Sequence, residues 1–179
     1  MNLPNKLTLF RIILIPFFLF FLLTDYCGNA GKFIALGIFA VASLTDMLDG
    51  KIARKYNLIT NFGKFMDPIA DKLLVSSAFI AFVQMNLLQA WIVIIFIARE
   101  FIISGFRLVA SDAGIVLAAS WWGKFKTAFQ MIMCLLLIIN LDYPVLNVIE
   151  QIFIYASLAL SIISLIDYLV KNRKVIADM

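Results

Sequence analysis

The sequence predicts an all-α integral membrane protein with six transmembrane helices. Of its 179 residues, 64% are hydrophobic and 15% are charged, whereas soluble domains are about 45–50% apolar and about 25% charged. The apolar residues form six runs, each near the length of about 20 residues that crosses a bilayer as a helix. Membrane-spanning strands would be shorter and would alternate apolar with polar residues. The composition therefore excludes a soluble globular domain and a disordered chain.

The first three runs lie in the N-terminal half of the chain. Run 7–23 contains Arg11 and lacks the small-residue cleavage site of a signal peptide, so we expect a retained helix. The second run covers residues 33–48. A polar stretch over residues 49–64 separates it from the third run, residues 65–85.

Three further runs follow at residues 87–109, 125–141 and 145–170. Asn86 is expected to form a tight turn before them, and Trp121 and Trp122 are expected to anchor the fifth helix at the membrane interface. Six spans occupy about 120 residues, which leaves only tails and short loops. We therefore expect residues 1–179 to form a single transmembrane domain, with any chemistry on its helices or in its short loops.

Lysine and arginine residues predict the orientation in the membrane. With the N-terminus inside, Lys32 lies outside, Lys72 and Arg99 lie within the membrane, and the others lie on or near the inner face. These others are Lys6, Arg11, Lys51, Arg54, Lys55, Lys64, Arg107, Lys124, Lys126, Lys171, Arg173 and Lys174. The positive-inside rule then predicts a multi-pass protein of the cytoplasmic membrane with both termini in the cytoplasm. Because topology explains the net charge of +4, no nucleic-acid partner is expected.

Histidine is absent from the chain, and the two cysteines, Cys27 and Cys134, lie in different segments. The absence of histidine excludes Ser-His-Asp triads, histidine-ligated zinc and histidine nucleophiles. The cysteines form no CxxC motif, and we expect them to be small packing residues. Any acid–base chemistry must therefore use other side chains.

Four of the 11 acidic residues cluster at the predicted inner ends of the second and third runs, namely Asp46, Asp49, Asp67 and Asp71. The spacings of three and four residues place each pair on one helix face. Four carboxylates at a lipid boundary repel one another and are costly to dehydrate, so positive charge must stand between them. An all-oxygen set favours Mg²⁺ or Mn²⁺, and two such ions can clamp a phosphate during in-line displacement.

The residues between these carboxylates suit a nucleotide. Gly50 and Ala53 leave bare helix surface beside Asp49, and Arg54 offers a bidentate contact to a phosphate. Gly63 again removes a side chain near the end of the polar stretch.

A structural interpretation of the same cluster stays open. The carboxylates would then pair with cations of the same region, namely Lys51, Arg54, Lys64 and Lys72. Asp67 is also predicted to cap a new helical turn, because Pro68 follows it and proline is favoured in the first turn of a helix.

The cluster carries the signature of a known family. Asp46-x2-Asp49-Gly50-x2-Ala53-Arg54-x8-Gly63-x3-Asp67-x3-Asp71 resembles, at every fixed position, the signature of the CDP-alcohol phosphotransferases. Segments 5–11, 97–100 and 123–127 are similar to those of bacterial members that use glycerol phosphate as the acceptor. The resemblance covers nearly the whole chain.

This resemblance implies a six-helix membrane enzyme with the fold of that family, usually a homodimer, whose active site opens to the cytoplasm. It would transfer a phosphatidyl group from CDP-diacylglycerol to sn-glycerol 3-phosphate and release CMP, a step of phospholipid biosynthesis towards phosphatidylglycerol. Two ions, Mg²⁺ or Mn²⁺, would be held by Asp46, Asp49, Asp67 and Asp71, and Asp71 would also act as the catalytic base. The implied CDP-lipid contacts are Asp49, Gly50, Ala53, Arg54, Thr60 and Gly63.

Basic residues predict the site of the acceptor phosphate. Arg107 lies seven positions after Glu100, so both share nearly one helical face, and Lys124 and Lys126 begin the fifth run. An anionic acceptor such as glycerol phosphate needs a basic pocket of this kind. Arg11 either extends to the membrane surface or reaches the mouth of the site, where it would be a fourth ligand of the acceptor phosphate. Inositol phosphate is also anionic, so only the flanking segments favour glycerol phosphate.

A cation transporter is the main alternative from another class. Transport sites lie near the membrane midplane, often between related repeats, whereas this cluster lies at one face and the sequence shows no repeat. Mg²⁺-dependent binding of CDP or CMP would distinguish the enzyme from a transporter or a scaffolding protein. Lys72 and Arg99 are predicted to lie within the membrane, where a charged residue either belongs to a functional site or pairs with a carboxylate to stabilise the structure.

Overall fold

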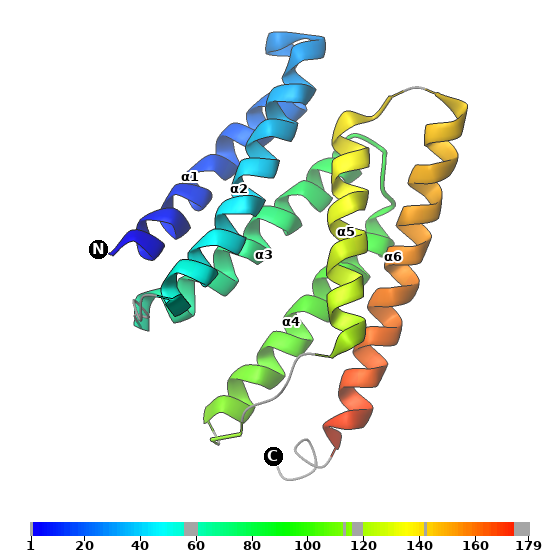
Figure 1. Ribbon diagram of the computed structural model, residues 1–179. Coiled ribbons are helices and arrows are strands. Elements are labelled where there is room, and N and C mark those ends of the chain that lie inside the picture. Colours follow the sequence, from blue (N-terminus) through cyan, green and yellow to red (C-terminus); the bar gives the residue numbers. More distant parts are fainter. Residues whose placement is uncertain (1, 56–60, 113, 116–119, 142, 174–179) are drawn as a thin grey trace. The chain divides into compact units, whose positions relative to one another are not determined.

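The structure is a computed structural model that describes residues 2–55, 61–112, 114–115, 120–141 and 143–173. Within these ranges, residues 3–4, 47–55, 61–62, 64–65 and 112 are described by their backbone alone. The helices, shown in Figure 1, are α1 (Leu3–Leu23), η1 (Asp25–Cys27), α2 (Asn29–Lys55), α3 (Asn61–Gln84), α4 (Ala90–Asp112), α5 (Trp121–Ile139) and α6 (Pro144–Lys171). The described residues contain no strand. The prediction of an all-α fold with six long helices is confirmed.

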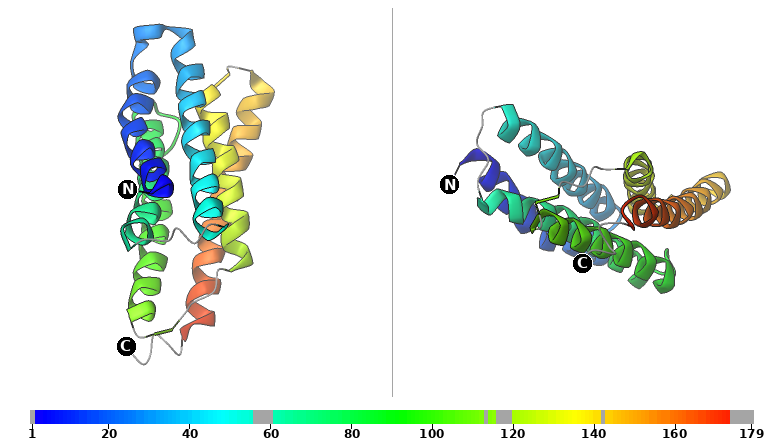
Figure 2. Two further views of the ribbon diagram at one scale, coloured as in Figure 1. Left: turned by 60° about the vertical axis from the view of Figure 1, so that its left-hand side comes forward. Right: turned by 90° about the horizontal axis from the view of Figure 1, so that it is seen from below.

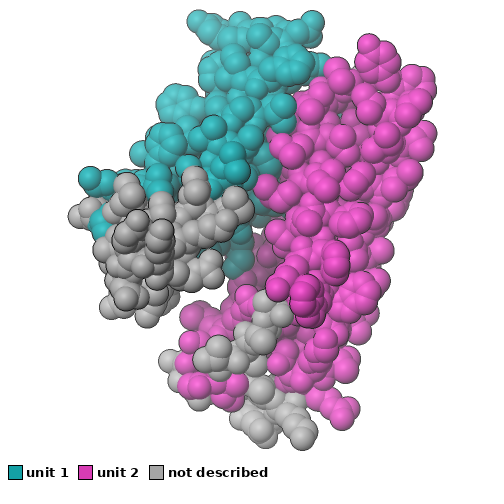
Figure 3. Space-filling view, viewed as in Figure 1, with its two compact units in different colours: residues 1–87 teal, residues 88–179 magenta. Residues whose placement is uncertain are grey.

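Two compact units divide the chain, Met1–Leu87 with α1 to α3 and Leu88–Met179 with α4 to α6 (Figure 3). The expectation of one catalytic domain over residues 1–179 stays a prediction.

In the first unit, α1 and α2 run side by side as an antiparallel pair joined through η1 (Figures 1 and 2). A Cβ atom on Gly31 would lie 2.9 Å from the Phe21 carbonyl oxygen, so glycine permits the close approach of the two helices there. The rings of Phe18 and Phe39 pack with their centroids 5.5 Å apart. Helix α1 also packs against α3.

The buried face of α1 follows the three- and four-residue spacing of a helix stripe. Its members are Asn5, Thr8, Arg11, Ile15, Phe18 and Leu22. The C-terminal half of this stripe is apolar, whereas the N-terminal half is polar. In the polar half, Arg11 contacts α2 and Thr8 contacts α3.

In the second unit, α6 packs against both α5 and α4. Asn140 ends α5 in the left-handed conformation, and its N–H bonds to the Leu136 carbonyl oxygen. Pro144 stands in the first turn of α6, where its missing N–H costs nothing. At the other end of α6, Ser120 donates a hydrogen bond to Asp167 at 2.5 Å and so ties the start of α5 to α6.

Among the described residues, three helices are long and apolar enough to cross a membrane, namely Asn5–Leu23, Trp121–Ile139 and Pro144–Lys171. They correspond to the predicted first, fifth and sixth spans, and they indicate a multi-pass membrane protein. Helices α2, α3 and α4 carry the charged residues of the predicted sites, which lowers their hydropathy. That these three also cross the membrane stays a prediction.

One local expectation is corrected and one is confirmed. Helix α2 continues into the polar stretch as far as Lys55, because residues 51–55 contain good helix formers and no proline. Pro68 lies inside α3, which begins at Asn61, so the prediction that Asp67 caps a new turn is wrong. Asn86 has a φ of 60°, as expected for a tight turn between helices.

Candidate active site

Arg11 of α1 and Asp46 of α2 form an ion pair in the first unit. The Arg11 Nη1 atom lies 2.6 Å from Asp46 Oδ1. The Arg11 side chain is fully buried, whereas that of Asp46 is 39% exposed. Of the two expectations for Arg11, extension to the membrane surface is therefore wrong. Arg11 contacts Asp46, which is the first aspartate of the signature.

Thr8, one turn before Arg11, contacts the other half of the signature. Its hydroxyl donates a hydrogen bond to Asp67 Oδ1 on α3, and the Thr8 side chain is fully buried. The sequence analysis did not single out Thr8 as a site residue. The three-residue spacing of Asn5, Thr8 and Arg11 was the available signal, because it places three polar residues on one face of an apolar helix.

The remaining signature residues follow the two helices. Asp71 lies one turn after Asp67 in α3 and is exposed, and Gly63 is buried in the first turn of α3. The i, i+4 spacing keeps Asp67 and Asp71 on one face, as predicted. The α2 backbone carries Asp49, Gly50, Ala53 and Arg54, whose side chains lie outside the described part, and Thr60 lies outside the described residues altogether.

The described carboxylates suit a hard cation. In the described part of the chain, Asp46 and Asp67 each make their hydrogen bonds and ion pairs through Oδ1, which leaves Oδ2 available. Oxygen donors of this kind are what Mg²⁺ and Mn²⁺ prefer. No group of three acidic or cysteine side chains at metal-binding distance occurs among the described residues. The predicted four-aspartate set includes Asp49, whose side chain is not described.

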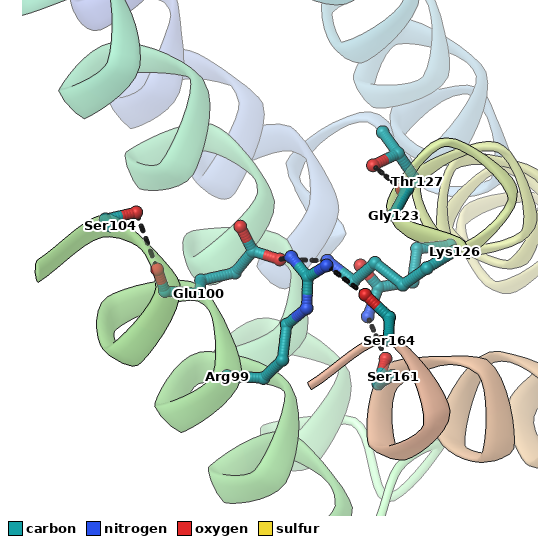
Figure 4. A network of polar contacts seen from close by, with 9 residues as sticks. Arg99, Glu100, Ser104, Gly123, Lys126, Thr127, Ser161 and Ser164 are labelled. Carbon is teal, nitrogen blue, oxygen red and sulfur yellow. Dashed lines mark hydrogen bonds and ion pairs between the residues drawn. The ribbon is translucent and has the colours of Figure 1, made fainter. Parts of the chain in front are cut away.

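A second polar network lies in the other unit (Figure 4). Glu100 Oε1 on α4 accepts from Arg99 Nη1 at 2.8 Å and also forms an ion pair with Lys126 on α5. Arg99 Nη2 donates to the Ser164 hydroxyl on α6. A Cβ atom on Gly123 would lie 3.4 Å from Arg99 Nη2, so glycine leaves the guanidinium its place. Pairing with Glu100, one of the two expectations for Arg99, is what the structure shows.

This network links all three helices of the unit through buried groups. Arg99 is 8% exposed and Lys126 is 3% exposed, so two buried cations share one carboxylate. Within the described residues, Arg99 Nε has no hydrogen-bond partner. Counted over these three side chains alone, the two cations exceed the one carboxylate by one positive charge.

Serine residues of α6 were missed by the sequence analysis. Ser157, Ser161 and Ser164 are fully buried on one face of α6, and Gln130 of α5 donates to Ser161 at 3.4 Å. Their spacing of four and three residues within an apolar run was the signal that could have found them.

The three basic residues predicted for the acceptor make different contacts. Lys126 belongs to the buried network, whereas Arg107 and Lys124 are exposed. The Arg107 guanidinium carbon lies 5.9 Å from the centroid of the Tyr168 ring. Lys124 Nζ lies 4.4 Å from the Trp121 ring centroid, a cation–π contact at the start of α5. The predicted shared pocket stays a prediction.

The fold and these residues define an all-helical membrane protein in which two signature aspartates, Asp46 and Asp67, contact the N-terminal helix. A sequence model of the family described as CDP-alcohol phosphatidyltransferase matches residues 1–163. The chain belongs to this family of transferases.

Three similar proteins cover most of the chain. The Bacillus subtilis CDP-diacylglycerol–glycerol-3-phosphate 3-phosphatidyltransferase is 44% identical and is matched over 96% of this chain and 95% of its own. The Haemophilus influenzae protein of the same name is 40% identical over 94% of this chain and 91% of its own. A probable phosphatidylglycerophosphate synthase of Mycobacterium tuberculosis is 38% identical over 95% of this chain and 81% of its own.

Proposed function

We propose that this protein transfers the phosphatidyl group of CDP-diacylglycerol to sn-glycerol 3-phosphate, giving phosphatidylglycerophosphate and CMP. The observation that carries the proposal is the complete signature within a chain 44% identical to a relative named for this reaction. The family is generally metal-dependent. We further propose that the protein is a homodimer in the cytoplasmic membrane, with both termini and the active site facing the cytoplasm.

The metal ligands in this proposal are Asp46, Asp49, Asp67 and Asp71, with Mg²⁺ or Mn²⁺ as the ions. The Oδ2 atoms of Asp46 and Asp67, which have no hydrogen bond or ion pair within the described residues, support the assignment. A bound divalent cation would neutralise the diphosphate and stabilise the charge that develops on the leaving CMP. The CDP-lipid would contact Gly50, Ala53, Arg54, Thr60 and Gly63 in addition to Asp49.

Asp71 is the catalytic base in this mechanism. The acceptor hydroxyl oxygen attacks the phosphorus of the phosphatidyl group, its proton passes to the Asp71 carboxylate, and the bridging oxygen leaves with CMP. A carboxylate is the natural base because the chain contains no histidine. The exposure of Asp71 supports access of a water-soluble acceptor.

Arg107, Lys124 and Lys126 are the proposed ligands of the acceptor phosphate. The exposure of Arg107 and Lys124 supports this role, because their aromatic contacts can be exchanged for a phosphate. Lys126 can contribute only while Glu100 balances part of the positive charge around it. Arg11, the fourth proposed ligand, would have to act from its place beside Asp46.

The test is a transfer assay with purified protein in lipid nanodiscs that contain CDP-diacylglycerol. Released CMP and the lipid product are measured with sn-glycerol 3-phosphate, with inositol phosphate or with no acceptor, each with Mg²⁺ and with chelator. We expect Mg²⁺-dependent CMP release with glycerol 3-phosphate. Product formed only with inositol phosphate would show that inositol phosphate, and not glycerol 3-phosphate, is the acceptor. Absence of CMP release with every acceptor would refute the transferase proposal.

A further inference from the structure

Burying the polar half of the α1 stripe costs free energy, because polar and charged side chains lose their contact with water. Thr8 and Arg11 are fully buried in a helix that is apolar enough to cross a membrane. A buried arginine in such a helix is expensive unless it is paired, and polar side chains in membrane helices mark functional sites by default. Packing alone would favour apolar residues here, as in the other half of the stripe.

The partners of these two residues come from different helices. Arg11 contacts Asp46 on α2, and Thr8 contacts Asp67 on α3. Each aspartate is the first of its signature pair. Because α1 packs against both helices, its stripe sets the positions of two carboxylates that lie 21 positions apart in the sequence.

We propose that α1 is a positioning helix of the active site, in which Thr8 and Arg11 orient the carboxylates of Asp67 and Asp46 for cation binding. The proposal rests on the proposed function and deepens it. Both contacts use Oδ1, so within the described residues the Oδ2 atom of each aspartate stays available. Residues that orient the ligands of a metal in this way are worth about 10- to 100-fold in its affinity.

Thr8 gives the cleaner test, because it carries no charge. Removing Arg11 would also remove a positive charge beside the site, which by itself raises cation affinity. Thr8→Val keeps the shape of the side chain and loses the hydroxyl, whereas Thr8→Ser keeps the hydroxyl. Thr45→Val is the matched control, because Thr45 is next to Asp46 but its hydroxyl bonds to the Ala42 carbonyl oxygen at 2.7 Å.

The experiment measures Mn²⁺ binding by electron paramagnetic resonance on purified protein with CDP and without acceptor, so no turnover occurs. Thermal unfolding of each variant is measured in parallel. We expect Thr8→Val to weaken Mn²⁺ binding about 10- to 100-fold, and Thr8→Ser and Thr45→Val to bind as the wild type does. Raising the Mn²⁺ concentration should restore the turnover of Thr8→Val, which a merely structural defect would not allow.

Wild-type Mn²⁺ affinity in a folded Thr8→Val would overturn the inference, as would equal losses in Thr8→Val and Thr45→Val. If Thr8→Val does not fold, Arg11→Lys decides, since it keeps the charge but replaces the guanidinium fork by a single ammonium group. Weaker Mn²⁺ binding by Arg11→Lys would support the inference, and unchanged binding would overturn it. Failure of the proposed function is distinguishable, because it appears in the transfer assay of the wild type.

Discussion

Replacing Glu100 by glutamine tests the buried network of the second unit. The substitution keeps the size of the side chain and removes the only negative charge of the Arg99–Glu100–Lys126 group, of which Lys126 is 3% exposed. Removing one partner of a buried ion pair costs about 3–5 kcal/mol, because the remaining charge loses that counter-charge while it stays buried. For a chain of this length each kcal/mol shifts the midpoint of thermal unfolding by about 2–4 °C. The expected fall in the midpoint is therefore about 6–20 °C.

The assay is thermal unfolding of the purified protein in one detergent, with Glu150→Gln as the matched control. Glu150 lies in α6, is 7% exposed, and has no ion pair or hydrogen bond through its side chain within the described residues. Its replacement should be neutral or stabilising, because it removes an unpaired buried charge. Adding Lys126→Met to Glu100→Gln should recover part of the loss, since one buried cation is removed. A midpoint of Glu100→Gln equal to that of the wild type would refute this reasoning.

Three further predictions concern the proposed reaction and its place in the membrane. Asp71→Asn keeps the size of the side chain but cannot accept the proton, so kcat should fall about 10²- to 10⁴-fold with little change in the affinity for CDP-diacylglycerol. Near-normal turnover would assign the base elsewhere. Arg107→Ala and Lys124→Ala should each raise the KM for glycerol 3-phosphate roughly 10- to 100-fold, since a charge-assisted hydrogen bond is worth about 1.5–3 kcal/mol; unchanged values would place the phosphate at other residues. Reporter fusions after Met179 and within residues 142–144 should report opposite sides of the membrane, and a common side would contradict the six-span topology.

The elements of this fold could be predicted from the sequence because helix formation in a membrane depends on local properties. Apolar run length fixes where helices lie, as in α1 and α6, and spacing fixes which residues share a face, as for Asp67 and Asp71. The aspartate signature is local for the same reason, since its residues follow one another along two neighbouring helices. Boundaries were less certain, because the helical continuation of α2 and the internal Pro68 of α3 depend on packing as well as propensity.

The partners of the buried polar groups were decided by the tertiary structure alone. The sequence left open whether Arg11 extends to the membrane surface or reaches the site, and Arg11 contacts Asp46 because α1 and α2 pack along that face. The position of Lys126 predicts a phosphate ligand, and only the structure shows that it also pairs with Glu100 on another helix. Periodicity determines which face a side chain occupies, and only the packing of helices against one another determines which faces meet.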